Sequence, residues 1–376
     1  MSTRLKIVTV VGTRPEIIRL SSVIKLLDTH TELVLVHTGQ NYDYELNEVF
    51  FEDLGLRSPD HFLEADTSSL GTALGTIISG TEKVLREEKP DAFLVLGDTN
   101  SCISALMAKR MKIPVFHMEA GNRSFDENVP EETNRRLVDH ISDYNLVYTE
   151  HARRNLLAEG IHSSRILLTG SPMREVLEEN AAQIDASDAV EKQGLEPQGY
   201  FLVSLHREEN VDNPERLQMA VETLEAIHSK YEIPVLVSTH PRTRKRLEAL
   251  GVQDIDGIIF HPPFGFHDYI KLQKEAKLVL SDSGTISEES SILDFPAVTM
   301  RDFIERPESQ DTGAIITTGL ASVDVLNSIE ITVEIFGSRK QSVLPNDYAI
   351  RDASQRILTF IRSNVHSHFQ RTGIRK

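Results

Sequence analysis

Short runs of apolar residues alternate along this chain with longer stretches in which apolar residues recur at helical spacing. An uninterrupted apolar run is typical of a strand buried on both faces of a parallel sheet. In the first half the predicted strands are 6–11, 33–37, 93–96, 114–116, 145–149 and 165–169, and the predicted helices are 17–27, 44–54, 69–85, 152–159 and one that begins at Pro130. This alternation predicts an α/β domain with a doubly wound parallel sheet.

The pattern breaks at Gly170-Ser171-Pro172, and residues 181–198 are polar and acidic. A second alternating series follows, with predicted strands at 200–204, 235–238, 257–260, 278–280 and 297–300. Because 376 residues exceed what one core usually fills, we expect two Rossmann-like domains, 1–172 and 173–347, facing each other across a ligand-binding cleft. Residues 348–376 are expected to cross back to the first domain, with an amphipathic helix at 348–363.

Composition narrows the class of partner. The chain is 40% hydrophobic and 26% charged, as in an ordinary soluble globular protein. Its net charge of -17 argues against nucleic acid or an anionic membrane as a partner. No apolar run is long enough to span a membrane, and the first residues do not resemble a cleavable leader. A single cysteine, Cys102, cannot form an internal disulfide, so a reducing cytoplasm is the simplest compartment.

Carboxylates gather in the stretch 114–140. An apolar strand runs into Glu119, a loop supplies Arg123, and the helix that begins at Pro130 carries Glu131 and Glu132 in its first turn. Strand ends and helix starts meet at the carboxyl edge of a parallel sheet, where such proteins bind ligands. General acid/base chemistry on a small ligand is therefore the leading hypothesis.

Each of these groups also has an ordinary structural interpretation. Glu119 can be held in an ion pair by Arg123 or by His117. The two glutamates after Pro130 can simply stabilise the helix, because acidic side chains in the first turn interact favourably with the helix dipole.

Two further strand ends in the first half carry polar groups. Gly12 ends the first strand and is followed by Arg14, which fits a phosphate-binding turn or an ordinary tight turn with a solvated arginine. Asp98, Thr99 and Asn100 end the third strand, where they are good helix caps. Their position matters because it is the edge that also holds Glu119.

Three strand ends in the second half are polar as well. The first strand ends in His206 and Arg207, and the second in His240 and Arg242. Asp282 and Ser283 open a Ser-Gly-Thr turn, whose free backbone N–H groups are expected to bind an anion together with the helix dipole. Glu288 and Glu289, in the first turns of that helix, complement its dipole or bind the hydroxyls of a ribose.

Seven motifs resemble the series of the non-hydrolysing UDP-N-acetylglucosamine 2-epimerase family. They occur in the family's order and span nearly the whole chain: GTRPE (12–16), GDTNS (97–101), HMEAGNR (117–123), PEETNR (130–135), HREEN (206–210), DSGTISEE (282–289) and RDFIERPE (301–308). The resemblance implies the two-domain fold of the GT-B glycosyltransferases, which agrees with the architecture predicted above.

Details resemble the branch that makes UDP-N-acetyl-L-fucosamine from UDP-2-acetamido-2,6-dideoxy-L-talose for capsule or O-antigen synthesis. Asn122 stands where the common UDP-GlcNAc enzymes have an apolar residue, the loop before Pro130 is two residues shorter, and Thr285 replaces a glycine. TGQNYDYEL (38–46) departs from the TGQH form of the enzymes that UDP-GlcNAc activates allosterically.

The resemblance implies a reaction without cofactor or metal, in which UDP is eliminated to leave a 2-acetamidoglycal and is then added back. It also implies homodimers. The catalytic residues it implies are Asp98, Glu119 and Glu131 for proton transfer and His206 for the pyrophosphate. The substrate-binding residues it implies are Arg14, Glu16, His240, Tyr269, Ser283, Gly284, Thr285, Glu289 and Arg301, with Tyr269 beside the uracil and Glu289 at the ribose.

Other functions share parts of this pattern. The nearest alternative is a UDP-GlcNAc/UDP-ManNAc 2-epimerase, which differs only in its sugar. A GT-B glycosyltransferase would need an acceptor and fewer carboxylates, a hydrolysing epimerase would release UDP, and a UDP-sugar-binding protein would not turn its ligand over. Acceptor dependence and net UDP release discriminate among them.

Overall fold

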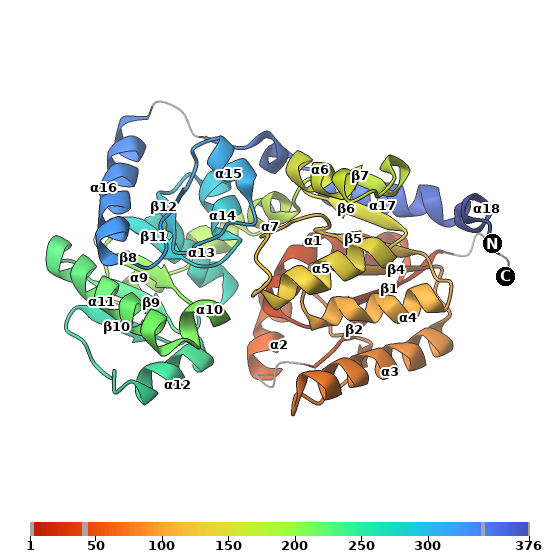
Figure 1. Ribbon diagram of the computed structural model, residues 1–376, viewed down its shortest axis with the longest axis horizontal. Helices are drawn as coiled ribbons and strands as arrows, with labels where there is room; N and C mark the ends of the chain where they lie inside the picture. The colour runs from red at the N-terminus through yellow and green to blue at the C-terminus, as the bar shows by residue number, and fades with distance from the viewer. Residues whose placement is uncertain (1–3, 40–43, 340–342, 375–376) are drawn as a thin grey trace. The chain divides into compact units, whose positions relative to one another are not determined.

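The computed structural model describes residues 4–39, 44–339 and 343–374 (Figure 1). Its contacts divide the chain into two compact units. Unit 1 is Met1–Glu179 with Ala349–Lys376, and unit 2 is Asn180–Tyr348. Each unit is built on one parallel sheet, so the predicted α/β class and its two doubly wound sheets are confirmed.

Unit 1 contains a seven-stranded sheet in the order β3-β2-β1-β4-β5-β6-β7. Its strands are β1 (Lys6–Val11), β2 (Glu32–His37), β3 (His61–Phe62), β4 (Ala92–Leu96), β5 (Val115–Met118), β6 (Tyr144–Val147) and β7 (Ile166–Leu168). Its α-helices are α1 (Arg14–His30), α2 (Tyr44–Asp53), α3 (Leu70–Glu88), α4 (Ala105–Arg110), α5 (Pro130–Ile141), α6 (Glu150–Ala158), α7 (Met173–Glu179), α17 (Ala353–Val365) and α18 (His368–Thr372), with 3-10 turns at Asn100–Ser104 and Ser163–Arg165.

Both faces of this sheet are covered, which explains the uninterrupted apolar runs. Val8 and Val10 of β1 belong to a core that also contains Val84 of α3 and Ala108 of α4. Helix α1 packs against α7 and α17. The sequence placed the C-terminal helix at 348–363, but Tyr348 lies in a 3-10 turn (Asn346–Ala349) and α17 begins only at Ala353.

Unit 2 contains a six-stranded parallel sheet in the order β10-β9-β8-β11-β12-β13. Its strands are β8 (Phe201–Ser204), β9 (Val235–Ser238), β10 (Ile258–His261), β11 (Leu278–Ser281), β12 (Ala297–Thr299) and β13 (Ile316–Thr317). Its helices are α8 (Ala181–Ala186), α9 (Ala189–Lys192), α10 (Glu208–Val211), α11 (Pro214–Tyr231), α12 (Pro241–Ala249), α13 (Phe266–Glu275), α14 (Ile286–Leu293), α15 (Pro307–Asp311) and α16 (Ser322–Ser338).

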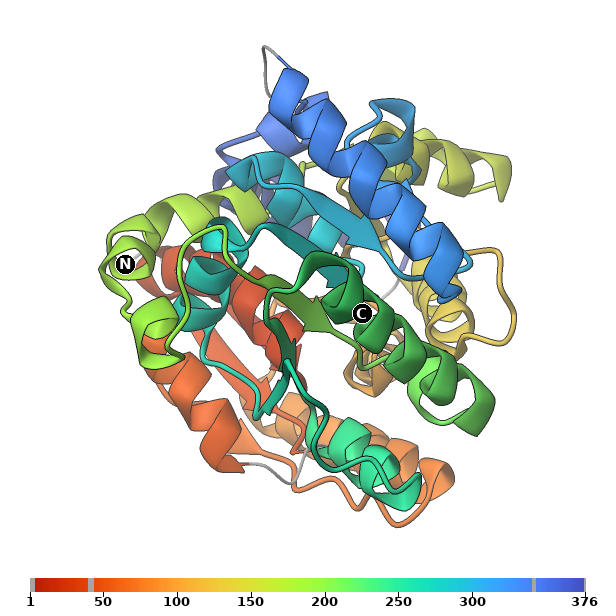
Figure 2. The same ribbon diagram turned by 90° about the vertical axis from the view of Figure 1, so that its left-hand side faces the viewer.

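Alternate residues of the strands in unit 2 serve two cores. Phe201 and Val203 pack with residues of α11 and α16, which lie side by side on one face (Figure 2). Leu202, which points the other way, packs with Leu272 of α13 and Ile286 of α14. No helix in the described ranges is long and apolar enough to cross a membrane.

In each sheet the chain first builds outward on one side of its first strand and then crosses to the other side. The strand order therefore reverses between β1 and β4 in unit 1 and between β8 and β11 in unit 2. Ligands of open α/β sheets bind outside the carboxyl ends of the strands at such a reversal. The polar strand ends singled out in the sequence lie at these two edges.

Candidate active site

Glu119 follows β5 directly and is the best-buried carboxylate among the predicted catalytic groups, with 3% of the residue exposed. Its backbone is left-handed (φ 59°), a conformation that residues with a Cβ rarely adopt. Arg19 of α1 forms an ion pair with Oε2 of Glu119. Arg135 of α5 donates to the main-chain oxygen of Glu119 at 2.7 Å and lies 3.3 Å from its Oε1.

Arg135 also forms an ion pair with Asp98, the residue after Gly97 at the end of β4. Asn134 holds the same loop from α5, because its Nδ2 donates to the main-chain oxygen of Asp98 at 2.9 Å. One guanidinium therefore joins the two carboxylates, Asp98 and Glu119, predicted to transfer protons. Two arginines therefore lie against two carboxylates, so neither carboxylate lacks a cationic partner.

Glu119 is held in ion pairs, as its ordinary interpretation expected, but the expected partners are wrong because Arg123 and His117 contact Asp139 instead. His117 Nδ1 lies 2.9 Å from Asp139 Oδ1, and Arg123 Nη1 lies 2.8 Å from Oδ2. Burial by itself raises the pKa of Asp139, but the hydrogen bond and charge of His117 and the charge of Arg123 outweigh it and hold that pKa below its ordinary value. Asp139 also accepts the backbone N–H of Gly121, so it fixes the loop that follows Glu119.

The two glutamates at the start of α5 have different environments. Glu132 is buried and its Oε2 accepts the backbone N–H of Ser124 at 2.9 Å, while its Oε1 lies 2.8 Å from Arg136. It ties the loop to the helix. Glu131, the predicted catalytic group, is half-buried in the same turn.

Glu16 and Arg14 begin α1 just after β1. Glu16 completes a capping box with Thr13, and its Oε2 accepts the backbone N–H groups of Gly12 at 2.7 Å and Thr13 at 2.8 Å. Its Oε1 accepts from the hydroxyls of Thr99, at 2.8 Å, and Ser101, which follow β4. Glu16 thus ties together the two loops at the strand reversal. Arg14 is half-buried, with its guanidinium 5.7 Å from the ring centroid of Phe50.

Asp282 ties together the corresponding loops in unit 2. It follows β11, is fully buried, and accepts the backbone N–H groups of His206 at 3.1 Å and Arg207 at 3.0 Å, which follow β8. Asn210 Nδ2 donates to it at 3.0 Å. Burial raises the pKa of Asp282, but His206 and these hydrogen bonds outweigh burial and hold it below its ordinary value. The imidazole of His206 remains partly exposed beside Asp282.

The Ser-Gly-Thr turn after Asp282 differs from its prediction. The backbone N–H of Ser283 donates to Ser281 Oγ at 3.0 Å, and that of Thr285 to Ser283 Oγ at 3.3 Å, so these two amides are not free. Two arginines and a carboxylate lie close to Gly284: a Cβ there would lie 3.7 Å from Arg306 Nε, 3.9 Å from Arg207 Nη2 and 3.9 Å from Glu305 Oε2.

Carboxylates accompany these cations. Glu305 Oε1 lies 3.1 Å from Arg301 Nη2 and 3.3 Å from Arg207 Nη2, and Glu288 forms an ion pair with Arg306. The predicted site residue Arg301 is thus part of an ion-pair network behind the turn.

The other predicted residues of unit 2 lie on three helices. Glu289 of α14 is buried and its Oε2 accepts from Gln273 Nε2 at 2.7 Å. Tyr269 of α13 is half-buried, and burial followed by the charge of Glu289 raises its pKa. His240 caps α12, because its Nδ1 accepts the backbone N–H of Arg242 at 3.2 Å.

Sequence reasoning assigned no role to Arg19, Arg135 or Asp139. The sequence did hold a signal for Arg19. It lies in α1 among apolar residues such as Ile17 and Leu20, and an arginine is seldom buried without a partner. The stretch 38–46, which departs from the TGQH form of the allosterically activated enzymes, includes residues 40–43, and these lie outside the described residues.

Two parallel-sheet units with polar strand ends at their reversals define a GT-B-like α/β protein. Residues 25–362 match the UDP-N-acetylglucosamine 2-epimerase family, and the chain belongs to it. This confirms the family on which the sequence analysis settled. The finer assignment to the L-fucosamine branch stays a prediction, supported by the residues that resemble that branch.

Three similar proteins illustrate the family. A structure of UDP-N-acetylglucosamine 2-epimerase from Rickettsia bellii has a TM-score of 0.90 and 46% identity, covering 98% of this chain and 99% of its own. The Methanocaldococcus jannaschii UDP-GlcNAc 2-epimerase, in complex with UDP-GlcNAc and UDP, has a TM-score of 0.89 and 37% identity, covering 96% and 100%. The UDP-2,3-diacetamido-2,3-dideoxy-D-glucuronate 2-epimerase of Pseudomonas aeruginosa is 38% identical over 334 residues, 86% of this chain and 91% of that protein.

Proposed function

We propose that the protein epimerises C2 of a UDP-2-acetamido sugar by eliminating UDP and adding it back. One observation carries this proposal: in a chain of this family, Arg135 joins two carboxylates, Asp98 and Glu119, at the strand edge of unit 1. A transferase that only moves a sugar has no need for two such groups, whereas removing a proton from one face of C2 and returning one to the other face needs a base and an acid.

The reaction balances without a cofactor. A carboxylate takes the C2 proton, the electron pair of the C2–H bond forms the C1–C2 double bond, and the C1–O pair leaves with UDP. A carboxylic acid then protonates C2 of the glycal from the other face while the UDP oxygen attacks C1. Asp98, Glu119 and Glu131 are the proposed proton-transfer groups, and Arg19 and Arg135 position Glu119.

Unit 2 supplies the proposed nucleotide-binding groups. His206 and Arg207, held by Asp282, present an imidazole and a guanidinium for the diphosphate, and Arg306 lies close to Gly284. The proposed ligand of the ribose hydroxyls is Glu289, and Tyr269 is proposed to flank the uracil. The relative from Methanocaldococcus jannaschii, which is in complex with UDP-GlcNAc and UDP, supports a UDP-sugar as the class of substrate.

For the sugar, we propose UDP-2-acetamido-2,6-dideoxy-L-talose, with UDP-GlcNAc as the second candidate. Asn122 supports the first through the resemblance, because it is one of the residues that mark that branch; it is 5% exposed, and its Nδ2 is buried without a hydrogen-bond partner among the described residues. An unsatisfied buried donor costs about 1–3 kcal/mol, so such a donor is commonly found where a ligand completes it. The relatives support the second candidate, since two of those described act by name on UDP-GlcNAc.

Proton NMR in D2O tests both parts of the proposal. The protein is incubated with each UDP-sugar in turn, and C2 deuteration, the new epimer and free UDP are followed. Deuterium entering C2 of the deoxy-talose compound alone, with little UDP accumulating, supports both reaction and sugar. Exchange with UDP-GlcNAc alone overturns the sugar, steady UDP release indicates a hydrolysing enzyme, and no exchange with either refutes the reaction.

Two isosteric variants test the catalytic groups. Glu119→Gln and Asp98→Asn should each lower turnover by about two to four orders of magnitude, the usual scale for a proton-transfer group. UDP affinity should change little, because the proposed nucleotide groups lie in unit 2. Glu87→Gln, which alters an exposed carboxylate on α3, is the matched control and should keep full turnover. Wild-type turnover in Asp98→Asn would remove it from the mechanism.

Asn122→Leu tests the choice of sugar. The variant should lower kcat/KM for the deoxy-talose compound relative to UDP-GlcNAc and should not lower the melting temperature, because it removes an unpaired donor. An unchanged ratio would show that Asn122 does not select the sugar.

We also propose that the protein acts as a homodimer in the cytoplasm, in the synthesis of capsule or O-antigen precursors. The support for a homodimer is the family's implied habit, and the support for the cytoplasm is that the chain has a single, buried cysteine, Cys102. Sedimentation velocity measures the oligomeric state directly.

A further inference from the structure

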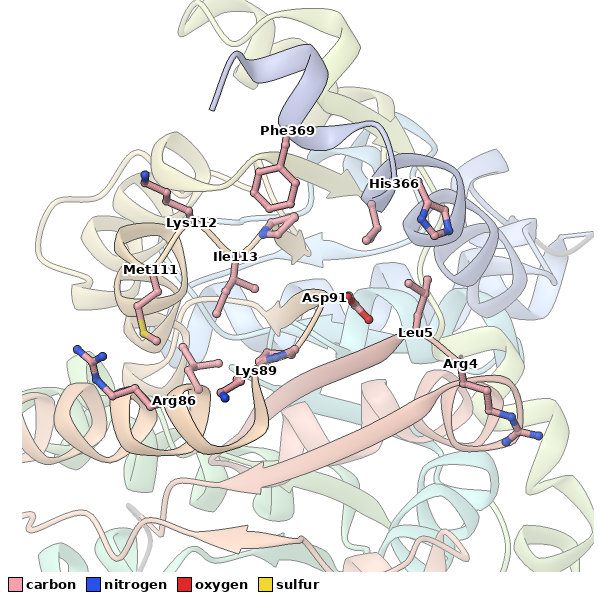
Figure 3. A pocket seen from close by; sticks show the side chains of 14 residues that line it. Arg4, Leu5, Arg86, Lys89, Asp91, Met111, Lys112, Ile113, His366 and Phe369 are labelled. Atoms are coloured by element: carbon pink, nitrogen blue, oxygen red, sulfur yellow. The ribbon is translucent and has the colours of Figure 1, made fainter. Parts of the chain in front are cut away.

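A cavity of about 670 Å³ lies at the opposite edge of the sheet in unit 1 (Figure 3). It is formed by the segment before β1, the α3–β4 and α4–β5 connections, and the turn between α17 and α18. Asp98 and Glu119 follow the carboxyl ends of β4 and β5, whereas this cavity lies at the amino ends. At about 3.3 Å per residue, a strand as long as β4 separates the two edges by roughly 16 Å. The proposed reaction uses nothing in the cavity.

The cavity is cationic on a strongly acidic protein. Arg4, Arg86, Lys89 and Lys112 line it, against one carboxylate, Asp91, among its described lining residues. The Oδ2 atom of Asp91 already accepts the backbone N–H of Lys6 at 2.9 Å. Arg86 pairs with Glu82, but that pair is exposed and therefore contributes little, so Arg86 can turn to another anion.

Two of these cationic residues, both lysines, have a left-handed backbone conformation. Lys89 has φ 50° and Lys112 has φ 63°. Glycine or asparagine is the ordinary choice where a chain leaves a helix in this conformation, because a Cβ is disfavoured there. Lysine at both positions therefore indicates that the ammonium groups serve a purpose, such as binding an anion. The ordinary alternative is that Lys89 complements the negative end of the α3 dipole.

Apolar side chains also line the cavity. Among them are Met111, Ile113 and Phe369, and in Figure 3 Phe369 lies near Lys112 while Met111 lies between Lys112 and Arg86. An aromatic face beside several cations fits a ligand that joins a flat apolar ring to a polyanion. The volume lies within the range of about 300–1,000 Å³ that small-molecule sites occupy.

We propose that this cavity is a second ligand site, for a nucleotide: the base lies against Phe369 and Met111, and the di- or triphosphate binds Arg86, Lys89 and Lys112. The site is independent of the proposed reaction, because it shares no residue with the catalytic edge.

Two methionines let one experiment observe both edges. Met111 lines the cavity, and Met118 directly precedes Glu119 at the catalytic edge. The protein is labelled with methyl-13C methionine and titrated with ADP at low salt. The Met111 resonance, assigned with Met111→Leu, should shift with a dissociation constant below about 1 mM, at ADP concentrations that leave Met118 unmoved. A titration with the UDP-sugar, whose sugar is proposed to react at Asp98 and Glu119, reports the catalytic edge through Met118, so failure of one site leaves the other measurable.

Lys89→Gly and Lys112→Gly test the contacts without straining the fold. Each should weaken ADP binding at Met111 by about tenfold, the scale of one charge-assisted hydrogen bond. Each should also keep or raise the melting temperature, because glycine suits the left-handed backbone. Lys83→Ala, which removes an exposed lysine of α3 that does not line the cavity, should leave binding unchanged.

Three results would overturn the proposal. The first is a Met111 resonance that ADP does not move. The second is a glycine variant that loses stability while ADP binding persists, which would make the lysines helix caps. The third is inorganic pyrophosphate binding as tightly as ADP, which would leave the base without a role.

Discussion

The sharpest test of the site is to remove the arginine that joins its two carboxylates. Arg135→Met keeps an unbranched side chain but deletes the guanidinium, which donates to the main-chain oxygen of Glu119 and pairs with Glu119 and Asp98. Removing one partner of a buried ion pair costs about 3–5 kcal/mol. Arg19 still neutralises Glu119, so we expect a loss near the lower end, about 3 kcal/mol.

Two measurements follow from that loss. Amide hydrogen exchange of peptides containing β4 and β5 should become roughly a hundredfold faster, since about 1.4 kcal/mol is a factor of ten. Peptides containing β8 and β11 should keep their rates, because that core belongs to unit 2. Turnover should fall by about a hundredfold through misplaced carboxylates, with little change in KM. Arg153→Met, which breaks a partly exposed pair with Glu150, is the matched control and should change both measurements little.

The double variant decides whether charge is the cause. Glu119→Gln in the Arg135→Met background removes the surplus negative charge and leaves Arg19 and Asp98 to balance. It should therefore recover stability, with a coupling energy of at least about 1 kcal/mol. Effects that add to within about 0.5 kcal/mol would refute the shared-guanidinium reasoning.

Two further predictions concern other buried groups. Burial lowers the pKa of His37 from 6.5 to about 4, so the unfolded imidazole binds a proton in this window while the folded one does not. The free energy of unfolding should therefore fall as the pH falls from 6.5 to 4, by up to about 3 kcal/mol from this residue. Denaturant titrations across this range should show a flatter pH dependence for His37→Asn, and an unchanged slope would contradict the assignment. In unit 2, Asp282→Asn removes the acceptor that holds the loop of His206 and Arg207, so calorimetry should show UDP affinity reduced by about tenfold with the melting of unit 1 unaltered. Wild-type affinity would mean that this loop does not bind the nucleotide.

Much of the fold was predictable because its signals are local. The long strands of both sheets show uninterrupted apolar runs, and their predicted starts and ends match the observed ones, as for β1, or differ by one or two residues, as for β4. The short edge strands β3 and β13 were missed, because two residues carry no periodic signal. The segment 181–198 showed no strand signal and forms helices α8 and α9.

The sequence alone also determined that carboxylates would end the strands, because a strand followed by a turn places its last residues at the sheet edge whatever the rest of the chain does. It determined Glu119 and Asp98 as candidates in this way. What it could not determine was their partners. Arg19 and Glu119 come from α1 and β5, and spacing along the chain says nothing about which face of a helix meets which strand.

Only the tertiary structure decided that Arg135 serves both carboxylates while the nearer Arg123 turns to Asp139. The physical reason is the orientation of the side chains. The packing of the helices and loops decides which way each side chain points, and a charged side chain pairs with the opposite charge that lies in that direction. The same is true of the cationic cavity, whose walls are brought together only when the N-terminal segment, two connections and the C-terminal helices assemble around one sheet edge.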